Sequence, residues 1–299
     1  MSNTPINQLE YKGDSLTLFM LYAQLLGGCL LTGGIYYFWG RVAILRYTIG
    51  SILINQTPYQ YLGTGKELCL SFLRFCCVCL GYLLFNYGIL WYGIHTIGWN
   101  CDLFIQTVFG INAIVLSGLL FYGVHRSLIY YFSRLAWKGV RYQLAGSSWE
   151  FTKLCLKKSF LNIITCSFTV PQSTLEIYGS LINQLYYGDQ KYRFQYETHN
   201  LLKPHLISLL LLIPTLGLSR LWYQAKLHNF IFDHMKFMDL EFRNTMRPTG
   251  LISLYLSNLI IIIASLGLGI PFAVNRSLKF YTEHLCIVGD LNRKRLIKG

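Results

Sequence analysis

The chain has 299 residues, of which 53% are hydrophobic and only 13% are charged. Soluble domains usually carry about 25% charged residues, so this composition excludes an ordinary water-soluble globular protein. The net charge is +13, from 26 Lys and Arg against 13 Asp and Glu. Because the basic residues are scattered between apolar runs, they indicate loops held at an anionic membrane surface, and we expect no nucleic-acid partner.

Residues 1–14 form a polar N-terminal segment without the basic start and small-residue cleavage site of a signal peptide. Six uncharged runs follow, at residues 15–40, 75–101, 103–125, 159–175, 204–219 and 248–275. A helix needs about 20 apolar residues to cross a bilayer, and the fourth and fifth runs are short for this. The pattern predicts an all-α polytopic membrane protein with about six hydrophobic helices. These helices would form one membrane domain at 15–291, followed by a basic tail at 292–299.

An internal repeat is predicted when the ends of the runs are aligned. The anchors are Thr32, Ser117, Thr165, Thr215 and Ser265, and the later anchors lie about 50 residues apart. Each is followed by a more amphipathic helix and a short β-hairpin with a polar turn. One unit is therefore an apolar helix, a break, an amphipathic helix and a hairpin. The third unit, at 165–184, has lost most of the pattern.

The predicted breaks combine glycine, a hydroxyl side chain and, once, proline. Glycine permits a left-handed backbone, and a Thr or Ser hydroxyl can hydrogen-bond a carbonyl that the break frees. The breaks are either ordinary capped helix ends or exposed backbone that lines a substrate path. The predicted break residues are Thr32, Gly33, Gly34, Thr215, Gly217, Ser265, Gly267 and Pro271.

Residues 31–47, with Thr32, Gly33, Tyr36, Trp39 and Arg41, resemble the signature of the YjgN family of bacterial inner-membrane proteins, the domain of unknown function 898. The elements at 59–65, 138–147, 266–273 and 288–291 are similar to the family's later motifs. The resemblance covers residues 14–291 and implies a multi-pass protein of the bacterial inner membrane. It implies no activity and no catalytic residues.

No arrangement of residues predicts an enzyme. All 13 acidic residues lie outside the six runs, which argues against a proton-coupled transporter. Neither a metalloprotease motif nor a phosphate-binding loop is present. Cys76, Cys77 and Cys79 have no nearby His or acid, so we expect no metal and no cofactor.

Basic residues at helix ends are the most unusual polar feature. Their position is explained either by the positive-inside rule, or by a site where several of them converge on an anionic headgroup or solute. The candidate anion contacts are Arg41, Arg46, Arg126, Arg220, Lys226, Arg276 and Lys279.

The expected topology places the loop at 98–103 in the periplasm, because it has no Lys or Arg. The basic segments 220–247 and 276–298 conflict with this alternation, because one long run at 248–275 separates them. Either that run is a hairpin broken near Gly267, or one basic segment faces outward.

Two functions remain open from the sequence. The first is transport or permeation of a small or anionic solute. The second is a non-catalytic envelope protein that binds anionic phospholipid or a partner protein. A closed cavity lined by basic and polar residues would favour transport, and a solid apolar interior with basic residues at the rim would favour binding.

Overall fold

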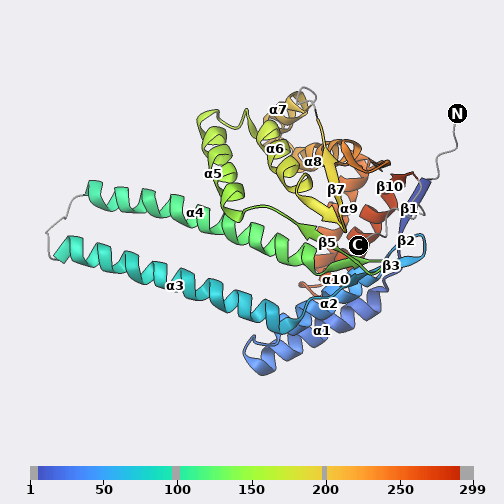
Figure 1. Ribbon diagram of the computed structural model, residues 1–299, viewed down its shortest axis with the longest axis horizontal. Coiled ribbons are helices and arrows are strands. Elements are labelled where there is room, and N and C mark those ends of the chain that lie inside the picture. The colour runs from blue at the N-terminus through green and yellow to red at the C-terminus, as the bar shows by residue number, and fades with distance from the viewer. Residues whose placement is uncertain (1–5, 96–101, 197–200, 290–299) are drawn as a thin grey trace.

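The computed structural model describes residues 6–95, 102–196 and 201–289, which contain ten helices and ten strands (Figure 1). The helices are α1 Ser15–Thr32, α2 Tyr37–Gly50, α3 Gly65–His95, α4 Asp102–Ser133, α5 Ser148–Ile164, α6 Val170–Ile182, α7 Leu202–Leu210, α8 Leu218–Asp233, α9 Pro248–Ala264 and α10 Ile270–His284. The strands are β1 Ile6–Tyr11, β2 Ile52–Ile54, β3 Thr57–Tyr61, β4 Leu135–Trp137, β5 Val140–Leu144, β6 Leu185–Tyr187, β7 Gln190–Phe194, β8 Met235–Phe237, β9 Leu240–Asn244 and β10 Leu285–Val288.

The ten strands form one closed barrel in which every neighbouring pair is antiparallel. The order follows the chain from β2 to β10, and β1 closes the ring between β10 and β2. The prediction of an all-α protein is therefore wrong. Separate hairpins at an interface would leave their edge N–H and C=O groups unpaired, and closure of the ring gives each edge a partner.

Tight turns join the strands within each hairpin. Asn55 and Gln56 have φ angles of 48° and 63°, and Lys138 and Gly139 have φ angles of 49° and 80°. Two central residues with positive φ are the pattern of type I′ turns, whose twist matches that of paired strands. The N-terminal segment supplies β1, in which Asn7 pairs with Ile287 near the other end of the chain.

The inner face of the barrel is filled by apolar and aromatic side chains. Residues alternate between the two faces of each strand, so Tyr192 and Phe194 are buried while Arg193 between them is exposed. Five cross-strand pairs join neighbouring hairpins inside the ring: Leu9 with Ile54, Tyr59 with Trp137, Tyr142 with Tyr187, Tyr192 with Phe237, and Phe242 with Ile287. These residues belong to one hydrophobic cluster, which makes the barrel interior the main core of the molecule.

Four of the five helix pairs turn through the same break. In the pair α9 and α10, Leu266 and Gly267 have φ angles of 50° and 92°. The hydroxyl of Ser265 donates to the carbonyl of Ile261 at 2.6 Å and accepts from the N–H of Gly269 at 2.6 Å. Thr32 and Thr215 make the same pair of hydrogen bonds at their breaks. The hydroxyl therefore joins the end of one helix to the start of the next.

The third unit keeps this geometry although its sequence lacks the glycines. Cys166 and Ser167 have φ angles of 47° and 72°, and the hydroxyl of Thr165 donates to the carbonyl of Leu161 at 2.8 Å. The second unit differs, because Ser117 lies inside the continuous helix α4. The long helices α3 and α4 replace the break there, and their connection lies outside the described residues.

Three helical stretches in the described part of the chain are long and apolar enough to cross a membrane: Ser15–Thr32, Gly65–His95 and Gln106–Ser133. The prediction of about six hydrophobic helices is wrong, because several uncharged runs are divided into two short helices. At 1.5 Å per residue, the 31 residues of α3 span about 46 Å. Figure 1 shows α3 and α4 projecting far beyond the other helices, on the side away from the barrel.

Candidate membrane-binding surface

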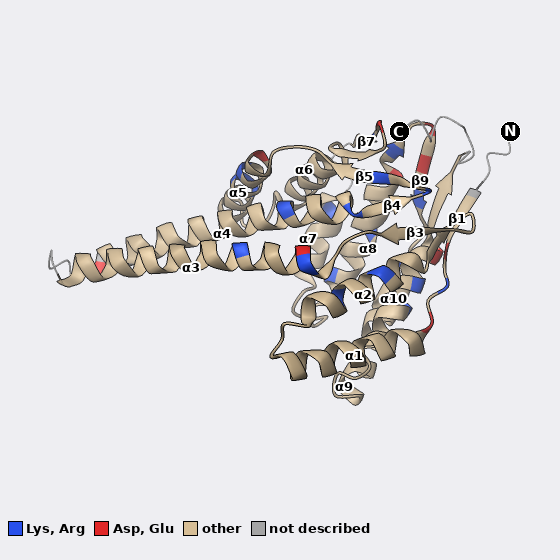
Figure 2. Cartoon of the chain, turned by 60° about the horizontal axis from the view of Figure 1, so that its bottom comes forward, with Lys and Arg blue, Asp and Glu red and all other residues tan. Residues whose placement is uncertain are grey.

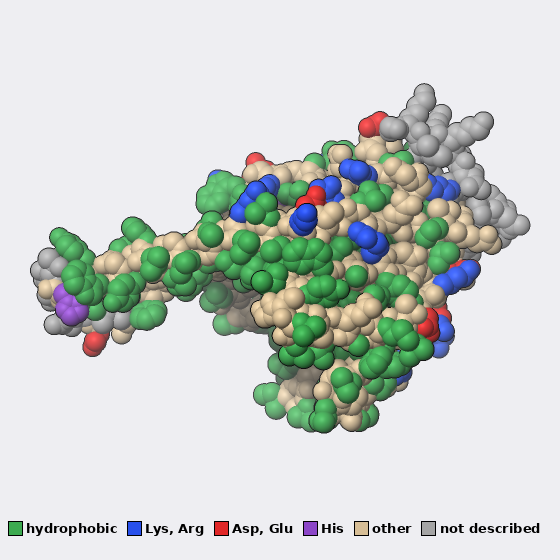
Figure 3. Space-filling model, turned by 90° about the horizontal axis from the view of Figure 1, so that it is seen from below, with side chains coloured by type: hydrophobic (Ala, Val, Ile, Leu, Met, Phe, Trp, Pro, Cys, Tyr) green, Lys and Arg blue, Asp and Glu red, His purple; other side chains and the backbone are tan. Residues whose placement is uncertain are grey.

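The ends of the short helix pairs that point away from the barrel expose large apolar side chains. We call these ends the helix tips: residues 31–36, 163–169, 211–217 and 263–269. Leu31 is 89% exposed, Leu216 is 94% exposed and Leu266 is 95% exposed. Figure 3 shows hydrophobic side chains gathered on the helices and on the projecting hairpin. A solvated protein does not normally expose so many large apolar residues together, so these surfaces are candidates for contact with a membrane or with another protein.

The first charged residues behind the tips define how deep the tips can enter a bilayer. Lys158 and Glu176 form an ion pair and lie about six residues from the break between α5 and α6. Arg276 lies about six residues beyond the break between α9 and α10. Six residues of helix span about 9 Å, which matches the 5–10 Å depth of interfacial helices.

The α3/α4 hairpin has a much longer uncharged part. No Asp, Glu, Lys or Arg occurs in residues 75–95 or 103–124. Each stretch has more than 20 residues and spans about 30 Å, the thickness of the hydrocarbon core. Figure 2 shows that the outer part of the hairpin is almost free of charged residues, whereas Lys and Arg lie around the barrel and the nearby helix ends. Its two helices are joined by a hydrogen bond from the Tyr82 hydroxyl to Asn112 Oδ1 at 2.5 Å.

The seven candidate anion contacts are spread over four helices. Arg41 and Arg46 are on α2, Arg126 is on α4, Arg220 and Lys226 are on α8, and Arg276 and Lys279 are on α10. Several have local partners: Arg46 donates to the Gly63 carbonyl at 3.2 Å, Lys226 lies 4.1 Å from the centre of the Trp222 ring, and Lys279 lies 3.9 Å from Glu283. In the described residues, no hydrogen bond or ion pair joins two of the seven to one shared partner.

Aromatic side chains inside the barrel pack against one another among the described residues. The Tyr59 and Tyr142 hydroxyls approach to 3.4 Å, and the Tyr187 hydroxyl donates to the Trp137 carbonyl at 2.8 Å. Burial raises the pKa of Tyr187 to about 12, and burial also raises the pKa of Tyr142 well above its ordinary value. These phenols therefore stay neutral at physiological pH and act as packing groups.

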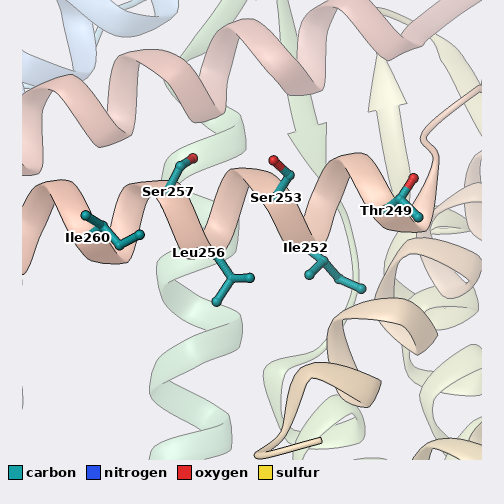
Figure 4. A pocket seen from close by; sticks show the side chains of 6 residues that line it. All are labelled: Thr249, Ile252, Ser253, Leu256, Ser257 and Ile260. Atoms are coloured by element: carbon teal, nitrogen blue, oxygen red, sulfur yellow. The ribbon is translucent and has the colours of Figure 1, made fainter.

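A shallow groove runs along α9, with a volume of about 450 Å³. Figure 4 shows Thr249, Ser253 and Ser257 pointing to the side of α10 and Ile252 and Leu256 pointing to the other side of α9, with Ile260 completing the apolar row. The hydroxyls recur every four residues and the apolar side chains do likewise, so each row follows one face of the helix. This spacing is visible in the sequence of residues 248–260, although the uncharged run at 248–275 predicted only an apolar helix.

The break residues lie at the helix tips rather than around a cavity. Thr32, Gly33 and Gly34 follow or end α1, and Thr215 and Gly217 precede α8. Ser265 and Gly267 separate α9 from α10, and Pro271 is in the first turn of α10. None of the described groups of His, Cys, Asp and Glu is arranged to hold a metal ion. Of the two interpretations of the breaks, the geometry matches capped helix ends.

The structure also decides between the two topologies left open for residues 248–275. The run is a helical hairpin broken at Gly267, so the segments on either side both return to the barrel. The basic residues before α9 and those on α10 beyond the 263–269 tip therefore lie on the barrel side of that tip. The predicted periplasmic loop at 98–103 lies almost entirely outside the described residues.

A family model described as "Bacterial protein of unknown function (DUF898)" matches residues 7–219 and 204–299. The chain belongs to the DUF898 family. The resemblance noted in the sequence is thus confirmed over nearly the whole chain. No curated protein and no solved structure matches this DUF898 chain. The family assigns no activity, so every functional role must be argued from the geometry.

Proposed function

We propose that this DUF898 protein is a non-catalytic protein of the bacterial inner membrane that binds anionic phospholipid at the cytoplasmic leaflet. In this proposal the α3/α4 hairpin crosses the bilayer, and the other helix pairs enter one leaflet by their tips. The barrel stands in the cytoplasm. The observation that carries the proposal is the difference in uncharged length: about 30 Å in the hairpin but only about 9 Å behind the tips of α5 and α10.

The position of the basic residues supports the orientation. Lys and Arg gather at the barrel end of the helices (Figure 2), and positive residues near membrane helices favour the cytoplasmic side. Anionic lipids attract such residues by about 1 kcal/mol for each Lys or Arg near the surface. Binding of the leaflet by many separate contacts agrees with basic residues that are spread over several helices.

Transport, which the sequence favoured, requires a path through the molecule. The barrel interior is occupied by Tyr59, Trp137, Tyr142, Tyr187 and Tyr192, and the groove along α9 and the groove beside Arg46 and Tyr59 are both open to the surface. Basic residues stand at the rim and the interior is apolar. This arrangement supports binding over permeation.

Three native cysteines at different places provide the test. Cys166 is exposed at a helix tip, Cys77 is exposed on the projecting part of α3, and Cys286 lies in β10 of the barrel. Variants that each keep one of these cysteines would carry a spin label, be reconstituted into phosphatidylglycerol vesicles, and be compared for collision with oxygen and with a water-soluble nickel chelate.

We expect the label at Cys77 to lie within the hydrocarbon, the label at Cys166 to lie roughly 5–10 Å below the phosphates, and the label at Cys286 to be in water. A water-exposed label at Cys166, or a lipid-exposed label at Cys286, would contradict the proposed placement. In the same vesicles, anion permeability above that of protein-free vesicles would favour transport instead. Weaker flotation with phosphatidylcholine than with phosphatidylglycerol vesicles would support the preference for anionic lipid.

A further inference from the structure

From the α9 groove and Arg276 beside it, we infer a site for one anionic phospholipid with a hydroxyl-bearing headgroup. This inference rests on the proposed function and adds a specific ligand to it. The polar groups that line the groove are the hydroxyls of Thr249, Ser253 and Ser257, and none of its lining residues is acidic. A site that offers hydroxyls and a cation but no carboxylate matches an anionic ligand.

Arg276 is the charged group of the site. Its Nη2 donates to the Ser257 Oγ at 3.0 Å, and the same hydroxyl donates to the Leu254 carbonyl at 3.1 Å. The guanidinium has five N–H donors, and its side chain is exposed. No ion pair joins Arg276 to a carboxylate within residues 6–95, 102–196 and 201–289. The Ser257 bond therefore fixes the guanidinium at the edge of the groove while its other donors face outward, where a phosphodiester can accept two of them.

The depth of the site matches the phosphate level of a leaflet. Ser257 lies seven residues before the end of α9, and Arg276 lies six residues after the start of α10. Both are therefore about 10 Å behind the tip. When the tip enters the leaflet as proposed, the guanidinium stands among the phosphates.

The two ends of the groove fit the two parts of such a lipid (Figure 4). Toward the tip, Ile260 is 67% exposed and Leu256 is 39% exposed, and they provide an apolar track for an acyl chain. Toward the barrel, Ser253 and Thr249 are exposed hydroxyls that can exchange hydrogen bonds with a headgroup hydroxyl. The volume of about 450 Å³ lies within the usual range for small-molecule sites and suits a headgroup with the first part of one chain.

The test is retention and rebinding of lipid by the full-length protein. The wild type, Arg276→Gln and Ser253→Ala/Ser257→Ala would be purified in mild detergent, and bound lipid would be measured by native mass spectrometry. Lys157→Gln is the matched control, because Lys157 is exposed on α5 about seven residues before its tip and loses the same charge. Delipidated protein would then be titrated with phosphatidylglycerol, with phosphatidylcholine and with inorganic phosphate.

We expect about one phosphatidylglycerol per chain for the wild type and for Lys157→Gln. Loss of a charge-assisted hydrogen bond should weaken binding roughly tenfold in Arg276→Gln, and the double serine variant should lose part of the preference for phosphatidylglycerol over phosphatidylcholine. Equal lipid retention by Arg276→Gln and Lys157→Gln, with unchanged circular dichroism, would overturn the site. Competition by millimolar inorganic phosphate would also overturn it, because the ligand would then be a free anion. The depth of Cys166 does not depend on this site, so failure here is distinguishable from failure of the proposed membrane placement.

Discussion

Removal of residues 1–11 tests whether the N-terminal strand holds the barrel closed. β1 has three registered residue pairs with β10 and three with β2. Asn7 adds a side-chain hydrogen bond from its Nδ2 to the Gly289 carbonyl at 2.7 Å. The deletion therefore opens a continuous ring and creates two unpaired strand edges. It keeps Asp14, whose carboxylate accepts from the Thr17 N–H at 2.8 Å and caps α1.

The expected loss of stability is large. A net contribution of about 0.5–1.5 kcal/mol for each hydrogen bond, with about one bond per registered pair, gives roughly 3–9 kcal/mol. The free energy of unfolding of a typical domain is about 5–15 kcal/mol, so the deletion should remove much of the barrel's stability. The deletion also removes the partly buried side chains of Leu9 and Tyr11, and this lowers the free energy of unfolding further.

The assay is thermal unfolding in detergent, followed by intrinsic fluorescence and by gel filtration. A chain that begins at residue 6 is the control, because it lacks five residues but keeps all of β1. We expect the control to melt like the wild type and the longer deletion to melt at a much lower temperature or to aggregate through its free edges. Equal melting temperatures for the two deletions would refute the reasoning that β1 closes the ring.

Three further predictions follow from individual residues. Leu216→Asp with Leu266→Asp should leave the melting temperature in detergent unchanged, because the two side chains are 94% and 95% exposed, but should reduce flotation with vesicles. Burial raises the pKa of Tyr187 to about 12. The neutral phenol therefore stabilises the fold fully below about pH 10, and this stabilisation is lost as the pH rises toward 12. In Tyr187→Phe, the melting temperature should depend less on pH between about pH 10 and 12. Glu176→Gln should destabilise the protein by roughly 1–3 kcal/mol, because it leaves the Lys158 ammonium, with only 11% of its side chain exposed, without its ion pair. Chemical denaturation of Glu176→Gln beside Lys157→Gln, a substitution at an exposed position on α5, would measure that loss.

Local features of the fold could be predicted from the sequence because each depends on a few adjacent residues. The left-handed break at Gly267 lies at a predicted break residue, and the turn at Asn55 and Gln56 belongs to one of the predicted short hairpins with a polar turn. The hydroxyl of Ser265 bonds the backbone on both sides of its break, as expected of a serine or threonine at a freed carbonyl. In contrast, Cys166 and Ser167 adopt the same break without glycine, because the surrounding helices impose it.

The barrel could not be predicted in the same way because its closure is not local. Strands of three residues, such as β6, are at the short end of the usual range and carry little pattern of their own. The alternation of Tyr192, Arg193 and Phe194 is typical of a strand with one buried face. The edges of each hairpin pair with the neighbouring hairpins, which lie about 40 residues or more away in the sequence. No local pattern indicates this pairing. The groove on α9 was missed for another reason, since its serines interrupt the apolar run only at every fourth residue.

Closure of the barrel also limits how many helices can cross a bilayer. Each of the five helix pairs begins and ends at the same barrel, so a pair crosses twice or not at all. Three of the described helices are long and apolar enough to cross a bilayer, and α1 is one of them. Its partner α2 cannot return across the bilayer, because α2 has only 14 residues and carries Arg41 and Arg46. If α1 crossed the bilayer without α2, β2 would lie on the opposite side of the membrane from β1, with which it pairs in the ring. Among the described helix pairs, α3 and α4 form the pair in which both members are long and apolar enough to cross. Hydropathy alone gives three candidate helices, but the closed ring is compatible with crossing by this pair, which is two crossings.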